Sequence, residues 1–152
     1  MATLAFYGCV VVAVLAGVKR VLVGRLDRGA DLLRGIREAV ERSGIRSGIV
    51  MLLGALGTVR VGYYDPSTKE YSIVEASGNF EVTSGVGNVS VREDGDLVVH
   101  LHITAQDRSG RVVAGHVMEG CIVSVTVEYA VLELDAQLTR RYDEETGLYL
   151  LT

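Results

Sequence analysis

Only one stretch of this sequence has the period of a helix, and almost everything around it has the pattern of β-strands. Between about Ala30 and Ser43, apolar residues recur at helical spacing. Asp31 places an acid in the first turn, and Gly44 can take the left-handed conformation that commonly ends a helix. The sequence therefore predicts one main helix, at about residues 30–43.

The rest of the chain predicts strands separated by short turns. The 18 glycines and the single proline are typical of a β-rich protein with tight turns. The expected strands are 18–26, 45–53, 58–64, 71–75, 80–84, 87–91, 97–105, 111–116 and 122–134, and Gly54–Gly57 is expected to be a turn. One helix followed by many strands predicts an α+β fold, a single domain whose large, mostly antiparallel sheet is barrel-like.

The length of 152 residues suits one domain, which we expect to cover residues 18–135. Residues 1–17 are an apolar extension, and residues 136–152 are a tail that we expect to pair, wrap or fray. The run from Leu4 to Val18 is shorter than the ~20 residues of a membrane helix, and it lacks the basic start of a signal peptide. Because its centre is β-branched, we predict an extra buried strand and no membrane partner.

Charge and cysteine content restrict the possible partners. The net charge is −4, which suits a polyanion binder poorly. Residues 19–46 carry eight basic and four acidic residues, but arginines and glutamates stand at helical pair spacing there, which favours a solvated helix face. Cys9 and Cys121 show no metal or redox spacing and lie in apolar runs, which predicts buried free thiols in a reducing cytoplasm. No glycine-rich phosphate loop is present, so no nucleotide cofactor is predicted.

All three histidines fall between residues 100 and 116. Side chains alternate along a strand, so His100 and His102 lie on one face of the strand 97–105, opposite its apolar positions. A three-residue connection at Arg108–Gly110 places His116 opposite His102, with His100 as a diagonal neighbour. A two-residue connection would instead send His116 to the other face, unless Gly115 forms a bulge.

In the first register, three imidazoles supply three vertices of a metal site and leave a fourth position for water or substrate. Zinc is the simplest candidate, while nickel, copper and iron remain open on ligand type alone. In the second, His100 and His102 are only the polar face of a strand. The spacing alone leaves both interpretations open.

Several short motifs together resemble one known family. They are Gly87-Asn88-Val89-Ser90, Val99-His100-Leu101-His102, and the run from Asp107 to Gly120 that contains Gly115-His116. Residues 26–31, 54–57 and 62–65 add to them, so that the resemblance covers about residues 18–135. The chain thus resembles the plants and prokaryotes conserved (PPC) domain, the domain that accompanies AT-hook motifs in plants and is described in prokaryotes as a predicted DNA-binding protein.

The resemblance implies an α+β subunit that assembles as a homotrimer. It also implies that His100, His102 and His116 hold a divalent metal, zinc first. The fold of the family is similar to that of acetolactate decarboxylase, a zinc enzyme that uses three histidines. No Arg-Gly-Arg-Pro core of an AT-hook is present, so direct nucleic-acid binding has no evident carrier in this chain.

Three functional hypotheses follow, and the sequence does not choose a reaction. The first is a trimeric metal-binding module of unknown role that binds a small-molecule ligand or a partner. The second is a metal-dependent lyase or hydrolase acting on a small carbonyl or carboxylate compound. The third is a DNA-associated regulatory protein. Near the metal, Glu119 could orient an imidazole or act as a base, and Arg60 could pair with a substrate carboxylate.

Overall fold

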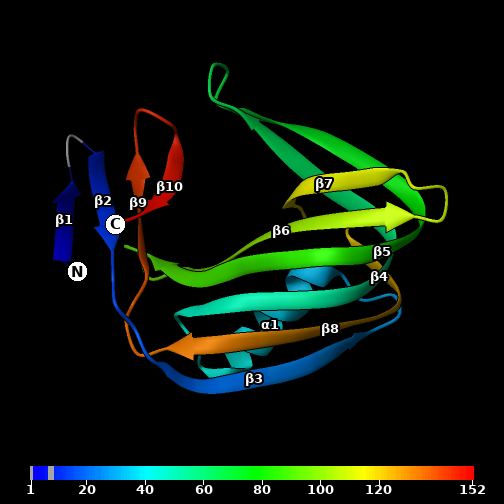
Figure 1. The fold of residues 1–152 in the computed structure, drawn as a ribbon, viewed down its shortest axis with the longest axis horizontal. Coiled ribbons are helices and arrows are strands. Elements are labelled where there is room, and N and C mark those ends of the chain that lie inside the picture. The colour runs from blue at the N-terminus through cyan, green and yellow to red at the C-terminus, as the bar shows by residue number, and fades with distance from the viewer. Residues whose placement is uncertain (1, 7–8) are drawn as a thin grey trace.

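The computed structural model describes residues 2–6 and 9–152, with side chains described from residue 13 onward (Figure 1). One helix, α1 (Leu32–Ser43), accompanies ten strands in the described residues. The strands are β1 (Ala2–Phe6), β2 (Cys9–Ala13), β3 (Val18–Asp27), β4 (Gly48–Asp65), β5 (Glu70–Arg92), β6 (Leu97–Asp107), β7 (Val112–Val117), β8 (Ile122–Leu134), β9 (Thr139–Asp143) and β10 (Leu148–Leu151). The predicted α+β class is confirmed, and so is the prediction of a single domain with one large, mostly antiparallel sheet.

Eight strands form the main sheet in the order β10-β9-β5-β6-β7-β4-β8-β3. All neighbouring strands are antiparallel except β5 and β9, which run parallel over Val91↔Thr139 and Arg92↔Arg140. Strand β4 also pairs with β5 along most of its length. Because β4 and β5 therefore pair both directly and through β6 and β7, these four strands close on themselves, which confirms the barrel-like curvature.

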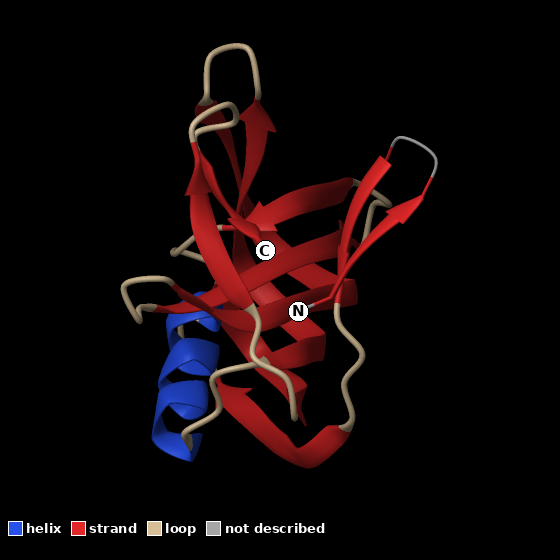
Figure 2. Ribbon diagram, turned by 90° about the vertical axis from the view of Figure 1, so that its left-hand side faces the viewer, coloured by secondary structure: helices blue, strands red, loops and turns tan. Residues whose placement is uncertain are grey.

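Helix α1 covers one face of the sheet, as Figure 2 shows. The Asp31 carboxylate accepts a hydrogen bond from the Arg34 N–H at the start of the helix, and Gly44 ends it with φ 73°. Its buried side chains Leu32, Ile36 and Val40 pack into one core with residues of the sheet, among them Leu101 and Ile103 of β6. The core face of β6 is thereby fixed, and the intervening side chains of this strand point away from the helix.

The predicted turn at Gly54–Gly57 was wrong, because β4 runs through it as one strand of 18 residues. Its register shifts on both sides of this segment. A Cβ atom on Gly54 would lie 2.3 Å from the Thr126 carbonyl oxygen. The glycine therefore permits close approach of β8 at a bulge, rather than a reversal of the chain. The three short segments expected between residues 71 and 91 are likewise one strand, β5.

The two ends of the chain form hairpins. Strands β1 and β2 pair only with each other within the described residues. The prediction of burial for residues 1–12 concerns side chains outside the described part, as does the prediction for Cys9.

Cys121 is a buried free thiol, as expected. The tail neither wraps nor frays, because β9 and β10 pair with each other and β9 extends the sheet at β5. Among the described residues, no helix is both long and apolar enough to cross a bilayer.

Candidate metal centre

The three histidines meet on the hairpin formed by β6 and β7. The connection Arg108–Gly110 is a tight turn in which the Asp107 carboxylate accepts hydrogen bonds from the backbone N–H groups of Ser109 and Arg111. The resulting register pairs His102 with His116 and Ile103 with Gly115. This is the first of the two registers considered above. It places His116 on the face of the hairpin that carries His100 and His102.

The ligand atoms of the three imidazoles all lie within 4.8 Å of one another. His102 Nε2 is 3.1 Å from His100 Nε2, and the His100 and His116 ring centroids are 4.7 Å apart. Two nitrogens bound to one zinc ion at ~2.05 Å in tetrahedral geometry would be about 3.3 Å apart. The His100–His102 pair therefore already stands near the spacing of two ligands on one ion.

Two glycines make the close packing around this cluster possible. A Cβ atom on Gly87 of β5 would lie 1.9 Å from the His100 carbonyl oxygen, so any other residue there would push β5 away from β6. Gly62 of β4 pairs with His116, and a Cβ atom on it would lie 2.7 Å from the Tyr71 ring. Tyr71 can therefore lie across Gly62 and pack against His116, with ring centroids 5.3 Å apart.

The C-terminal tail contributes a residue that the sequence did not single out, Arg140. Its side chain is only 8% exposed. The guanidinium donates to Ser90 Oγ, the Tyr149 carbonyl and Asn88 Oδ1, and it lies 3.0 Å from His100 Nδ1. Because arginine has only donors, His100 Nδ1 accepts, and a neutral His100 ring then carries its proton on Nε2. For Nε2 to bind a metal, this proton would have to move to Nδ1, and the Arg140 contact at Nδ1 would then have to open.

The imidazoles of His100 and His116 are held in their neutral form. Burial, with smaller contributions from His116, Arg140 and His102, lowers the pKa of His100 from 6.5 to about 4. Burial also lowers the pKa of His116, helped by His102 and Arg140. Neutral imidazole is the form that binds a metal, so neither of these two rings has to lose an imidazolium proton at neutral pH.

A cavity of about 380 Å³ opens beside the histidines. Its polar lining includes His100, His116, Arg92 and Arg140, and Tyr71 and Tyr149 supply aromatic surface. Val98, Val99, Leu148 and Leu150 make much of the remaining wall. The volume lies within the range of small-molecule sites. A ligand in this cavity would therefore lie directly against two of the three imidazoles.

The other two residues singled out in the sequence lie away from this cavity. Arg60 donates to the Glu119 carbonyl and lies 3.5 Å from a Glu75 carboxylate oxygen. Glu119 lines a smaller cavity between α1 and β6. Neither side chain belongs to the lining of the cavity beside the histidines. The arginines that line this cavity are Arg92 and Arg140, and no local motif marks them in the sequence.

The donor set fits a divalent metal of the zinc type. Three imidazoles from adjacent strands are a common protein ligand set for zinc, and no carboxylate or thiol joins the cluster among the described residues. One feature is unusual, because ligating histidines normally donate their second N–H to an acceptor. Here His100 faces the Arg140 guanidinium instead.

Comparisons with known proteins find one matching family model and several similar structures. The model of the Plants and Prokaryotes Conserved (PCC) domain matches residues 14–135. The structure is similar to that of a metal-containing protein from Archaeoglobus fulgidus, with 33% identity, TM-score 0.85, and coverage of 93% of this chain and 99% of that one. A PPC protein from Pyrococcus horikoshii is 29% identical, with TM-score 0.84 and coverage of 93% and 97%.

A third structure, from Bacteroides thetaiotaomicron, is described only as a candidate DNA-binding protein. It is 22% identical to this chain, with TM-score 0.82 and coverage of 90% and 96%, and it shows the fold alone. No curated protein matches the chain.

Proposed function

The chain belongs to the plants and prokaryotes conserved domain family, and from that premise we propose that it is a homotrimeric metal-binding module in which His100, His102 and His116 hold one divalent cation. The observation that carries the proposal is the convergence of three imidazoles, with ligand atoms within 4.8 Å of one another. Zinc is the first candidate. The module works in a reducing cytoplasm, where the buried Cys121 thiol stays free.

Elemental analysis of protein purified without chelator tests the metal site. We expect near one metal per chain, and loss of that metal in a His100→Ala/His102→Ala variant. Thr104→Ala is a matched control, because Thr104 lies on the same strand but outside the three-histidine cluster. Absence of metal from the unchanged protein would contradict the proposal, as would full metal content in the double variant.

An exposed apolar surface supports assembly of the trimer. Val23 of β3, Met51 and Leu53 of β4 and Val86 of β5 are 73%, 54%, 60% and 52% exposed. These residues help to line one shallow depression of about 460 Å³. Clusters of exposed apolar side chains commonly mark surfaces that a partner covers. In this proposal the partner is a second copy of the chain.

Light scattering of the purified protein tests the assembly. We expect the mass of a trimer for the unchanged chain and a smaller species for Val23→Glu, because a buried carboxylate without a partner is costly. Val112→Glu is the control, since Val112 is similarly exposed, at 55%, but lies outside the depression. A monomer for the unchanged chain would overturn the trimer.

The cavity beside the histidines favours a second candidate, a metal-dependent lyase or hydrolase. A cation held by three imidazoles keeps one coordination position for water or substrate, and the cavity lies against His100 and His116. A metal-loaded crystal structure separates the two candidates. A water molecule as fourth ligand favours catalysis, whereas a fourth protein ligand favours a structural role.

DNA association has weaker support. Arg37 and Arg42 of α1 lie 3.0 and 3.4 Å from glutamate carboxylates of the same helix, and the net charge is −4. These pairs leave little free positive charge on the helix for phosphates. A binding assay at two salt concentrations tests this hypothesis, because phosphate contacts require an affinity that falls steeply with salt.

A further inference from the structure

In the described part of the chain, the cavity beside the histidines is lined by two arginines and by no acidic residue. Arg92 and Arg140 are partners on the neighbouring parallel strands β5 and β9, where like charges repel. Arg140 is buried, and its hydrogen-bond partners are all uncharged: a serine, an asparagine, a histidine and a backbone carbonyl. Among the described residues, neither arginine lies within 4.0 Å of a carboxylate.

The two arginines differ in what their donors do. Arg140 uses its guanidinium to join β5, β10 and His100, so it is a fixed positive charge. The Arg92 guanidinium stacks over the Tyr149 ring, 4.1 Å from its centroid. Arg92 Nε is buried and has no hydrogen-bond partner within the described chain. Because Nε is buried, a ligand in the cavity cannot reach it, and the two terminal nitrogens of Arg92, which make no hydrogen bond among the described residues, are the donors that remain for a ligand.

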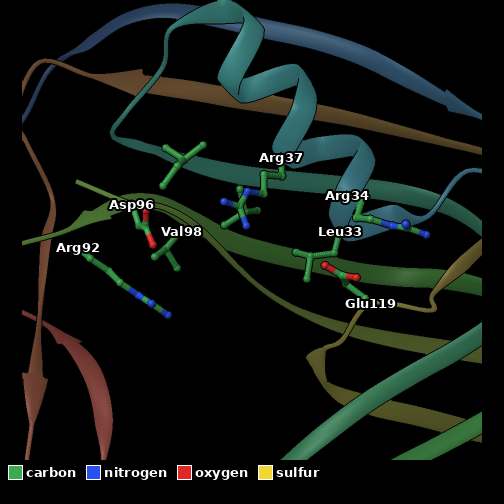
Figure 3. Close-up of a pocket in the computed structure, with 9 residues that line it drawn as sticks. Leu33, Arg34, Arg37, Arg92, Asp96, Val98 and Glu119 are labelled. Carbon is green, nitrogen blue, oxygen red and sulfur yellow. The ribbon is translucent and has the colours of Figure 1, made fainter. Parts of the chain in front are cut away.

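Arg92 stands between two cavities, because it also lines the smaller one between α1 and β6. Figure 3 shows that smaller cavity, with Arg37 reaching in from the helix. Asp96 and Glu119 line the smaller cavity but not the one at the histidines. The smaller cavity thus sets two acids against its three arginines, Arg34, Arg37 and Arg92, whereas no acid opposes the two arginines that line the histidine cavity among the described residues.

We propose that the cavity beside the histidines binds a small carboxylate with an apolar body, and that Arg92 holds its carboxylate group. The two carboxylate oxygens match the arginine fork, and Arg140 adds a second positive charge nearby. Val98, Val99, Leu148 and Leu150 then contact the apolar body. This inference deepens the proposed function, since the same cavity opens onto the three histidines, and it names the chemical class of the ligand.

Calorimetric titration of the full chain tests the site. The probes are 3-methylbutanoate, the uncharged 3-methylbutanamide of the same shape, and inorganic phosphate, an anion without an apolar body. We expect the carboxylate to bind at least about tenfold more tightly than either of the others, because each alternative lacks one of the two recognised features. Equal binding of acid and amide would overturn the proposal, and so would tighter binding of phosphate.

Two variants assign the binding to Arg92. Arg92→Gln should weaken binding of 3-methylbutanoate at least about tenfold, and Arg92→Lys should recover only part of it, because lysine lacks the planar fork. Arg37→Gln is the matched control, since Arg37 pairs with Glu41 and does not line the histidine cavity. Unfolding curves confirm that each variant is folded. Unchanged affinity in a folded Arg92→Gln protein would overturn the assignment.

The same titration separates this inference from the metal site. It is run on the metal-loaded protein and on the His102→Ala variant, with metal content measured on each sample. Binding that depends on Arg92 in a protein without metal would support the carboxylate site while the metal proposal fails. One metal per chain with no binding of 3-methylbutanoate would overturn the carboxylate site and leave the metal site standing.

Discussion

Two hairpins meet at the candidate site, and they are held in different ways. The hairpin β6–β7 supplies all three histidines, and a turn of three residues sets its register. The hairpin β9–β10 supplies Arg140 and Tyr149, and it joins the sheet through two parallel residue pairs with β5 and through one buried guanidinium. The metal ligands therefore rest on local pairing, whereas the positive charge beside them rests on contacts between residues about 50 positions apart.

The largest effect is expected where the first hairpin packs on β5. In Gly87→Ala the new Cβ would clash with the His100 carbonyl oxygen, 1.9 Å away, and backbone atoms cannot rotate aside. We expect a loss of more than about 3 kcal/mol of unfolding free energy, measured by urea denaturation, together with loss of metal.

Gly95→Ala provides the control for Gly87→Ala. Gly95 has φ 95°, but a Cβ atom on it would meet no other atom within 4 Å, so alanine there introduces backbone strain without a clash. We expect a loss of about 1 kcal/mol. Equal losses in the two variants would show that close approach at His100 does not limit the sheet.

The second hairpin is tested by Arg140→Met. The change leaves Ser90 Oγ, Asn88 Oδ1 and the Tyr149 carbonyl without their shared donor. We expect a loss of about 2–3 kcal/mol in urea denaturation, and faster proteolysis within residues 139–151. Arg141→Met is the control, because Arg141 is exposed and its nearest acid, Glu93, is 3.9 Å away. If the Arg140→Met variant were as stable as the control, the stability of the β9–β10 hairpin would not depend on the guanidinium.

A smaller loss is expected from the turn of the first hairpin. Asp107→Ala removes the acceptor of the Ser109 and Arg111 N–H groups. We expect a loss of about 1–2 kcal/mol and weaker metal binding, because this turn sets His102 opposite His116. Asp94→Ala is the comparison, since Asp94 accepts only from the Asp96 N–H. Unchanged metal affinity in Asp107→Ala would show that β4 and β5 hold the register without the turn.

The same contrast explains what the sequence could predict. Alternation placed His100 and His102 on one face, and the length of one loop gave a register for His116, because both depend on neighbours in sequence. The pairing of Arg92 with Arg140 depends on a parallel contact between strands that are not neighbours along the chain. No local pattern encodes such a contact. The prediction of a turn at Gly54–Gly57 was wrong for a related reason. Gly54 allows the neighbouring strand β8 to approach closely and does not reverse the chain.

The smallest effect concerns acid, and it again separates the two hairpins. In the unfolded chain His100 and His116 take up protons near pH 6.5, whereas in the folded protein burial lowers the pKa of His100 to about 4 and lowers that of His116. As pH falls below 7 the unfolded state binds more protons, so the unfolding free energy falls. Between pH 7 and 6 we expect a loss of about 0.7 kcal/mol from His100, and a loss in the same direction from His116.

Urea denaturation of chelator-treated protein at pH 7, 6 and 5 measures this loss. A His100→Asn/His116→Asn variant should lose most of the dependence on pH, whereas Arg141→Met should retain it. Hydrogen bonds from Ser109 and Thr146 lower the pKa values of the Asp107 and Asp143 carboxyl groups. These two groups therefore titrate below this pH range. An unchanged slope in the double variant would show that the acid response comes from outside the histidine hairpin, and that the cavity does not keep these imidazoles neutral.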